Sequence, residues 1–282
     1  MWLAPARCAC RCGRDLGGRS RIRDERPRTS PTNLRCPEQD RGPPGCRRRD
    51  STGVASKTAE VLDMKIGIIG AGNIGGNLTR RLTALGHEVS VANSRGPHTL
   101  TELAEETGAT PVTVEEAARG AAVVVVAIPL KAVPDLPSGL FDEAAEGVAV
   151  IDTGNYYPKQ RDGRIAAIED GLTESRWTEQ QIGHPVIKAF NGTYAQDILD
   201  KPRPKGDPER IALPVAGDDE AAKKVVRDLI DELGFDTVDA GGIDESWRQQ
   251  PDTPVYGLRG GVEAVTKALA EASPERPEAL RA

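Results

Sequence analysis

The stretch MKIGIIGAGNIGG (residues 64–76) decides the fold, because it joins a buried strand to a glycine-rich turn and a helix. Residues 65–69 are mostly apolar and β-branched, as is typical of a central strand in a parallel sheet. Gly70, Gly72 and Gly75 follow in G-x-G-x-x-G spacing. The first glycine permits a tight turn, the second lets the backbone approach a pyrophosphate, and the third lets the next helix pack closely on the strand. The pattern predicts an α/β fold, a doubly wound Rossmann-type parallel sheet that binds a dinucleotide.

The segment after the next strand indicates which dinucleotide is bound. Residues 88–92 (EVSVA) are predicted as that strand, and an NAD-preferring site usually carries Asp or Glu at its end. Asn93, Ser94 and Arg95 stand there instead. A carboxylate would repel a 2′-phosphate, whereas a hydroxyl and a guanidinium bind one through charge-assisted hydrogen bonds. Ser94 and Arg95 therefore favour NADP(H), against the alternative that Arg95 is only a solvated loop residue.

Residues 1–63 differ in composition from the rest of the chain. They carry 14 of the 37 Lys and Arg, 8 of the 43 Asp and Glu, all five cysteines and few large apolar residues. Such a segment cannot bury enough apolar surface to offset its chain entropy, so we predict a disordered Arg-, Pro- and Cys-rich leader. Its cysteines lack the paired spacing of a zinc module, and it has no apolar region of a secretory signal. Because Met64 stands where the fold begins, we also consider that the leader is not translated.

The part from Met64 onward is acidic, with 23 basic and 35 acidic residues, and contains no cysteine. An acidic surface gives no general attraction to nucleic acid or to an anionic membrane. The longest strongly apolar run, residues 121–130, is too short to span a bilayer. A fold without cysteine does not depend on disulfides, which makes a reducing cytosol its natural compartment. We expect a cytoplasmic protein with no nucleic-acid or membrane partner.

Strands and helices alternate along this acidic part. A first domain, the NADP-binding Rossmann domain, is predicted over residues 64–194, and a smaller C-terminal α/β portion over residues 195–282. Later helices are expected at 100–107, 115–119, 219–233 and 255–272, later strands at 110–112, 121–129, 148–152, 185–189, 211–216 and 235–239, and a loop and helix region at 159–183.

Ligands of doubly wound sheets bind at the carboxyl edge of the strands, and four predicted loops meet there. The glycine turn is one of them, and Ile128 and Pro129 end a second strand. Asn155 follows the next strand, and Asn191 the one after it. We predict a hydride-transfer site around Asn155 and Asn191, where each amide either contacts a bound ring or caps its own loop.

No side chains near this edge have the spacing of a catalytic triad or of a metal site. His87 lies in a turn at the far end of the second strand and His184 precedes a strand, so both are expected to be structural. Reduction of a carbonyl or imine usually requires a general acid. Hydride exchange between two redox cofactors requires chiefly face-to-face positioning and exclusion of water. The edge therefore favours positioning of redox cofactors, with no catalytic residue assigned and no metal.

A resemblance to a known family covers residues 64 to about 242. The chain resembles the NADPH-dependent coenzyme F420 reductases and related flavin-linked oxidoreductase domains. The motifs that carry the resemblance are GIIGAGNIG, ANSRGP, VVVVAIP, VIDTGNYY, VIKAFNGTYAQDI, PVAGDD and GFDTVDAGGID. The resemblance implies a deazaflavin (F420) or flavin stacked on the nicotinamide. It also implies that NADP(H) is bound by Ala71, Gly72, Asn73, Ile74, Ser94, Arg95, Ile128 and Pro129.

Two other functions remain open. One is an NADP-dependent reductase of a small carbonyl or imine, although such reductases usually append a long all-helical dimerisation domain that is not evident here. The other is a non-catalytic NADP(H)-sensing module, which an intact glycine motif without an acid or base would also suit. A homodimer is a further expectation, because the predicted terminal helix has an apolar face that either a partner or its own domain could cover.

Overall fold

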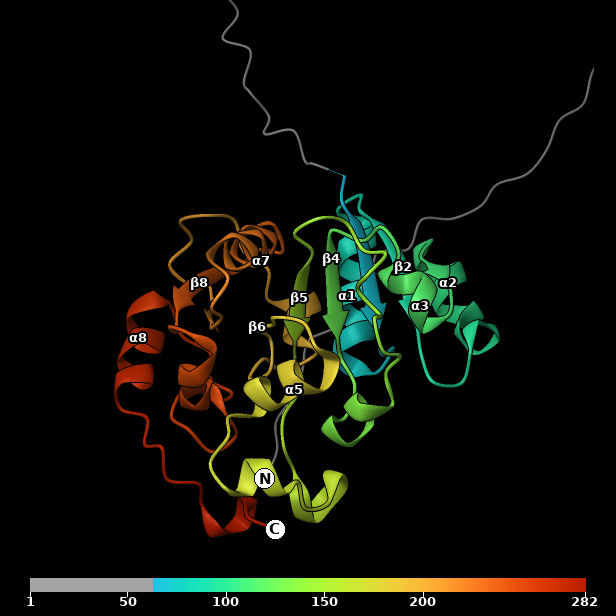
Figure 1. The fold of residues 1–282 in the computed structure, drawn as a ribbon. Helices are drawn as coiled ribbons and strands as arrows, with labels where there is room; N and C mark the ends of the chain where they lie inside the picture. Colours follow the sequence, from blue (N-terminus) through green and yellow to red (C-terminus); the bar gives the residue numbers. More distant parts are fainter. Residues whose placement is uncertain (1–62) are drawn as a thin grey trace, which may run out of the picture. The chain divides into compact units, whose positions relative to one another are not determined.

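The computed structural model describes residues 63–282, so the predicted leader lies outside the described residues except for Asp63. Six parallel strands form the main sheet in the order β3-β2-β1-β4-β5-β6 (Figure 1). This is the strand order of a Rossmann-type sheet, whose direction of winding reverses between β1 and β4 and leaves a crevice at their carboxyl ends. The predicted doubly wound fold is confirmed. The strands are β1 (Lys65–Ile69), β2 (Glu88–Ala92), β3 (Thr110–Pro111), β4 (Val123–Val126), β5 (Ala149–Asp152) and β6 (Ile187–Lys188).

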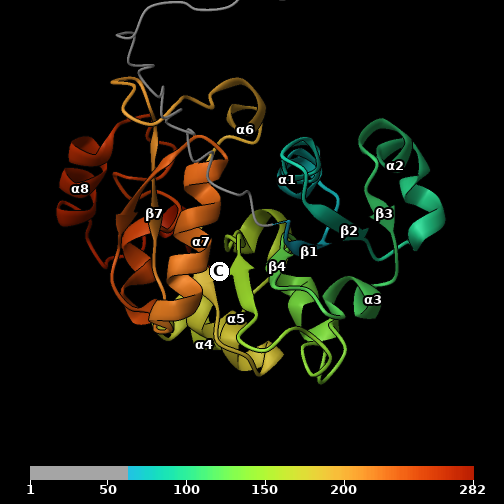
Figure 2. The ribbon, with the colours of Figure 1, turned by 90° about the horizontal axis from the view of Figure 1, so that it is seen from above.

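Helices cover both faces of this sheet, as the view from above shows (Figure 2). α1 and α7 lie on one face, and α3 lies on the other. Within residues 63–282, no helix is long and apolar enough to cross a membrane. The α-helices are α1 (Asn73–Ala84), α2 (Thr101–Thr107), α3 (Val114–Ala118), α4 (Ala166–Glu169), α5 (Glu174–Ile182), α6 (Asp197–Asp200), α7 (Glu220–Glu232) and α8 (Val262–Ala270). Single helical turns of other types are η1 (Pro97–Leu100), η2 (Leu130–Asp135), η3 (Pro158–Asp162), η4 (Ile243–Gln249) and η5 (Glu278–Leu280).

The sequence of β4 explains its central place. All four of its residues are valine, and all four are buried. Val123 and Val125 belong to the hydrophobic core on the α1 side, whereas Val124 and Val126 belong to the core on the α3 side. Successive side chains of a strand point to opposite faces, so only a continuous apolar run suits a strand with helices on both sides.

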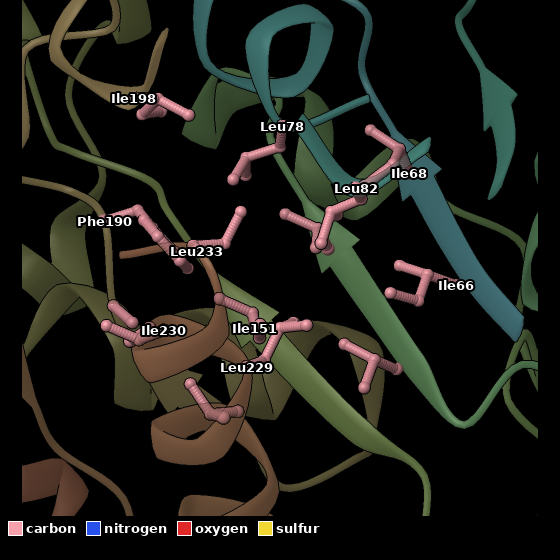
Figure 3. Close-up of a cluster of buried hydrophobic side chains, with 14 of the residues drawn as sticks. Ile66, Ile68, Leu78, Leu82, Ile151, Phe190, Ile198, Leu229, Ile230 and Leu233 are labelled. Atoms are coloured by element: carbon pink, nitrogen blue, oxygen red, sulfur yellow. The ribbon is translucent and has the colours of Figure 1, made fainter. Parts of the chain in front are cut away.

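The portion after Tyr194 extends the sheet and completes its core. β7 (Ala212–Val215) and β8 (Asp236–Asp239) pair in parallel, and α7 connects them. Ala216 forms an antiparallel bridge with Lys188, so the small sheet continues from the end of β6. Figure 3 shows Leu229 of α7 beside Ile151 of β5 in one cluster of buried side chains. The C-terminal portion therefore shares its hydrophobic core with the nucleotide-binding sheet.

The terminal helix is shorter than the predicted range of 255–272, because α8 begins only at Val262. Gly257, Gly260 and Gly261 precede it, and Gly257 has a φ of +74°, which an α-helix cannot contain. The residues before α8 form a loop instead, and this loop places Tyr256 at the carboxyl edge of the main sheet.

The apolar side of α8 is covered mostly by its own chain. Val265 and Leu269 are buried against the small sheet formed by β7 and β8. Val255 is buried in the same cluster, and only Val262 remains exposed, at 47%. The face that the sequence offered to a dimer partner is therefore used within the fold, and a homodimer stays an untested expectation.

Candidate cofactor and hydride-transfer site

The glycine turn has the geometry that the three glycines were expected to provide. Gly70 has a φ of +109°, and a methyl group on its Cα would lie 2.3 Å from the carbonyl oxygen of Ala127. A methyl group on Gly75 would lie 1.8 Å from the carbonyl oxygen of Gly70, so any side chain there would force α1 away from β1. Gly72 differs from both, because a methyl group on it would meet nothing within 4 Å. Gly70 and Gly75 thus shape the turn, and Gly72 leaves open space beside it.

This open space lies at the N-terminus of α1. Gly72 and Asn73 are exposed, and Ala71 and Ile74 are half-buried beside them. Gly72 is the N-cap, no side chain caps the helix, and its first turn contains no acidic residue. The first backbone N–H groups of a helix lack intrahelical partners and carry partial positive charge, which suits them to bind phosphate.

The loop after β2 holds the residues expected to select NADP(H). The side-chain oxygen of Asn93 accepts a hydrogen bond from the Arg95 backbone N–H at 2.9 Å, and its amide donates to the Thr99 hydroxyl at 2.9 Å. These bonds fold the loop into a fixed turn, while Ser94 and Arg95 remain exposed. The Arg95 guanidinium makes no hydrogen bond or ion pair with any residue of the described part. It is therefore free to bind an anion next to the ribose position.

Apolar residues bring the ends of β1, β4 and β5 together. Ile128 and Pro129 are half-buried at the carboxyl end of β4. Ile128 packs so closely on Gly70 that a methyl group added to this glycine would lie 2.9 Å from the Ile128 Cγ2 atom. Leu130 packs on Gly154 in the same way, since a methyl group added to Gly154 would lie 3.0 Å from the Leu130 Cδ1 atom. Three of the four predicted loops thus meet at one edge of the sheet.

The fourth predicted loop contacts the third through the two predicted amides, Asn191 and Asn155. Asn191, only 5% exposed, donates hydrogen bonds to the Asn155 side-chain oxygen at 3.0 Å and to the Gln249 carbonyl at 2.7 Å. The amide of Asn155 donates in return to the Asn191 carbonyl at 2.8 Å. The Gln249 amide donates to the Asn191 side-chain oxygen at 3.2 Å. This arrangement fixes both loops, and the half-buried Asn155 is the member that reaches the open side.

Two tyrosines extend the amide network. The Tyr157 and Tyr256 hydroxyls form a hydrogen bond of 2.6 Å, and the Asn155 amide donates to the Tyr256 hydroxyl at 3.4 Å. The Arg161 guanidinium lies 5.4 Å from the centre of the Tyr157 ring and donates to the Asn155 backbone carbonyl. Burial and the hydrogen bond with Tyr157 raise the pKa of Tyr256 above its usual value of 10.0, so its phenol stays protonated at neutral pH. Sequence analysis missed Tyr256 because it assigned the residue to a helix, although Gly257 was a signal against that helix.

A buried cluster of charged side chains binds the backbone of the loop after β5. The Lys188 ammonium is fully buried, 3.5 Å from Asp152 and 3.8 Å from Glu174, and it donates to the Gly154 carbonyl. The Asp152 carboxylate accepts hydrogen bonds from the Gly154 N–H at 2.8 Å and from the Ser175 hydroxyl at 2.6 Å. Asp152 therefore binds the backbone N–H of Gly154 and Lys188 binds its carbonyl, which fixes the backbone next to Asn155. A lysine inside the apolar strand PVIKA was the sequence signal for this cluster.

The C-terminal segment completes the charge balance of the cluster. Arg276 lies 3.3 Å from the Glu174 carboxylate and 5.1 Å from the centre of the Tyr156 ring. Burial raises the pKa of Glu174, and Lys188 and Arg276 oppose this rise. The cations Lys188 and Arg276 thus share one desolvated space with the carboxyl groups of Glu174 and Asp152.

His87 and His184 lie away from this edge, as expected. His87 accepts a hydrogen bond from the Met64 backbone N–H at 3.3 Å and lies 3.2 Å from Glu232. The His184 ring lies 4.9 Å from that of Phe141, just before β6. Within residues 63–282, no cluster of His, Cys, Asp and Glu could hold a metal ion.

Comparison with known proteins identifies the family. The family model described as NADP oxidoreductase, coenzyme F420-dependent, matches residues 65–156. A hypothetical protein from Sinorhizobium meliloti, SMa0349, is 30% identical in its crystal structure, with a TM-score of 0.58 over 69% of this chain and 94% of that one. The chain belongs to the coenzyme F420-dependent NADP oxidoreductase family. The family assignment confirms the predicted resemblance.

Three further relatives match the chain over smaller shares or at lower identity. A structure from Arthrobacter sp. FB24, provisionally named an F420-dependent NADP reductase, is 25% identical with a TM-score of 0.50, over 64% of this chain and 86% of that one. The Escherichia coli protein YjhV is 53% identical over 53 residues, 19% of this chain. The chain covers 39% of YjhV and 32% of an erythronate-4-phosphate dehydrogenase from Salinibacter ruber, to which it is 32% identical over 126 residues. The chain therefore spans less than half the length of these two curated relatives.

Proposed function

We propose that this protein transfers a hydride between NADP(H) and a flavin-type acceptor, either coenzyme F420 or an ordinary flavin. The observation that carries the dinucleotide half is the pairing of an open α1 N-terminus with the exposed Ser94 and Arg95. The first suits a pyrophosphate and the second a 2′-phosphate. In this arrangement Ala71 to Gly75 hold the pyrophosphate, and Ile128 and Pro129 form the apolar wall beside the nicotinamide.

The proposal of a flavin-type acceptor rests on the chemistry at the carboxyl edge of the sheet. Asn155, Asn191 and their neighbours offer fixed amides and phenols, and no histidine or cysteine lies with them in the described part. A ring cofactor already carries its own redox chemistry, so the protein needs mainly to orient it and exclude water. The name of the family model and that of the Arthrobacter structure support F420 as the first acceptor to test.

A small carbonyl or imine remains the second candidate acceptor. The observation that favours it is the protonated phenol pair of Tyr157 and Tyr256, because such substrates need a hydrogen-bond donor at the atom that becomes negative. An NADP(H)-sensing module, the third reading of the sequence, predicts binding without turnover.

Absorbance of the nicotinamide tests these alternatives with the full chain. NADPH is mixed in separate cuvettes with F420, FMN, FAD, a cyclic imine and a 2-keto acid, and its oxidation is followed with NADH as the comparison. Fast oxidation by F420 or a flavin supports the proposal and names the acceptor. Oxidation by the imine or keto acid alone replaces it with the second candidate, and tight NADPH binding without oxidation by any of the five replaces it with the sensor.

A further inference from the structure

The two phenols at the carboxyl edge have one hydroxyl hydrogen more than their partners can accept. Tyr157 and Tyr256 bring two hydroxyl hydrogens, and one of them lies in the bond between the two oxygens. The third group at the pair, the Asn155 amide, donates to Tyr256 and cannot accept. Whichever phenol donates to the other, the second phenol keeps a hydrogen that has no acceptor within the described part of the chain.

The surroundings keep this hydrogen available as a donor. Tyr256 is desolvated, and its pKa is raised, so it does not lose the proton near neutral pH. The Arg161 guanidinium over the Tyr157 ring adds positive charge on the same side. Asn155, which the Asn191 amide holds in place, fixes the direction of the pair. A fixed donor next to a cation stabilises a negative charge that develops within hydrogen-bond distance.

We propose that the Tyr157–Tyr256 pair donates this hydrogen bond to the hydride acceptor, at the atom that becomes negative when the hydride arrives. The proposal rests on the proposed function and assigns a role to two residues at that site. It places the polar end of the acceptor against the phenols and its hydride-accepting atom toward the nicotinamide, between Asn155 and the apolar wall of Ile128.

The proposed step is balanced without a further reactant. The hydride carries two electrons from C4 of NADPH to the acceptor, which leaves NADP⁺ and gives the acceptor one negative charge. The phenol pair donates a hydrogen bond to that charge and keeps its own proton. A proton from water neutralises the product, and the half-buried Tyr157 and Tyr256 are both partly accessible to water.

Substitution of each phenol by phenylalanine in the full chain tests the proposal. Tyr157→Phe, Tyr256→Phe and the double variant are compared with Tyr194→Phe, whose exposed ring stacks on Arg259, 4.4 Å away, outside the hydrogen-bonded pair. Three quantities are measured: the NADPH dissociation constant by nicotinamide fluorescence, the melting temperature, and the single-turnover rate of NADPH oxidation with the five acceptors named above.

We expect all three variants to bind NADPH within twofold of the wild type and the double variant to transfer hydride at least about tenfold more slowly, because loss of an oxyanion donor typically costs this much or more. Each single variant keeps one hydroxyl hydrogen without an acceptor, so its rate should lie between that of the wild type and that of the double variant. A wild-type rate in the double variant, or a rate loss equal to that of Tyr194→Phe, would overturn the assignment while leaving the proposed function intact. Failure of the wild type with all five acceptors would overturn both.

Discussion

The side chain of Asn191 donates a hydrogen bond of 3.0 Å to the side chain of Asn155, although the two residues follow different strands of the sheet. Each amide also bonds to the other loop's backbone or to Gln249, so the pair closes a circuit between the loops after β5 and β6. The asparagines that the sequence suggested as ring contacts therefore first hold each other. Of the two, Asn155 is half-buried and Asn191 is buried.

Asn191→Asp is expected to destabilise the fold. The carboxylate cannot donate to the half-buried Asn155 oxygen or to the buried Gln249 carbonyl, so both acceptors lose their donor and face a negative charge. The loss should reach about 2–4 kcal/mol of the free energy of unfolding, measured in urea. Asn93→Asp is the control: Asn93 is partly exposed, and the Thr99 hydroxyl can turn to donate to the new oxygen. Equal losses in the two variants would contradict the buried circuit.

Gly72→Ala and Gly75→Ala should separate binding from folding. The Gly75 variant must move the backbone of Gly70, so we expect a loss of several kcal/mol in the free energy of unfolding. The Gly72 variant meets no atom and should lose at most about 1 kcal/mol as an N-cap change. Its methyl group nevertheless occupies the space in front of α1, so NADPH affinity should fall by at least about tenfold. A Gly72 variant with wild-type affinity would place the pyrophosphate elsewhere.

The elements that the sequence predicted differ physically from the residues that it missed. β1, α1 and β2 were predictable because local signals agree there: apolar periodicity, glycine spacing and loop chemistry point to the same elements. Tyr256 was not, because an apolar periodicity from Val255 to Leu269 matched a helix and outweighed Gly257. Arg276 was not either, since its meaning depends on Glu174, a residue 102 positions earlier that only the fold brings near. Local pattern thus predicts the glycine turn and the loop after β2, whereas long-range contacts determine where Tyr256 and Arg276 lie.

Arg95→Ala should change the choice of dinucleotide. A guanidinium bound to a 2′-phosphate makes charge-assisted hydrogen bonds that NADH cannot make, so we expect NADPH affinity to fall by about tenfold or more and NADH affinity by less than about twofold. Fluorescence titration with both dinucleotides measures the two constants. Arg119→Ala, an exposed arginine just after α3, should leave both unchanged. If Arg95→Ala weakens NADPH and NADH equally, the 2′-phosphate role is wrong.

Arg276→Gln should destabilise the protein more at pH 8 than at pH 5. Glu174 is buried and its folded-state pKa is raised, so in the folded state it holds its proton at pH values where the unfolded chain, with a pKa of about 4.3, has lost it. Stability therefore falls as the pH rises from about 4.3 to the folded-state pKa. Without Arg276 that pKa rises further, the window widens, and the loss in the free energy of unfolding grows across it. At pH 5 the carboxyl is protonated more easily, and the variant should lie closer to the wild type.

Urea unfolding at both pH values measures the difference between Arg276→Gln and the wild type. Arg119→Gln, which breaks only the exposed pair with Glu143, is the control and should show a small and equal change at each pH. A loss for Arg276→Gln that does not depend on pH would mean that the arginine stabilises the protein through its contact with Tyr156, and not through the charge of Glu174.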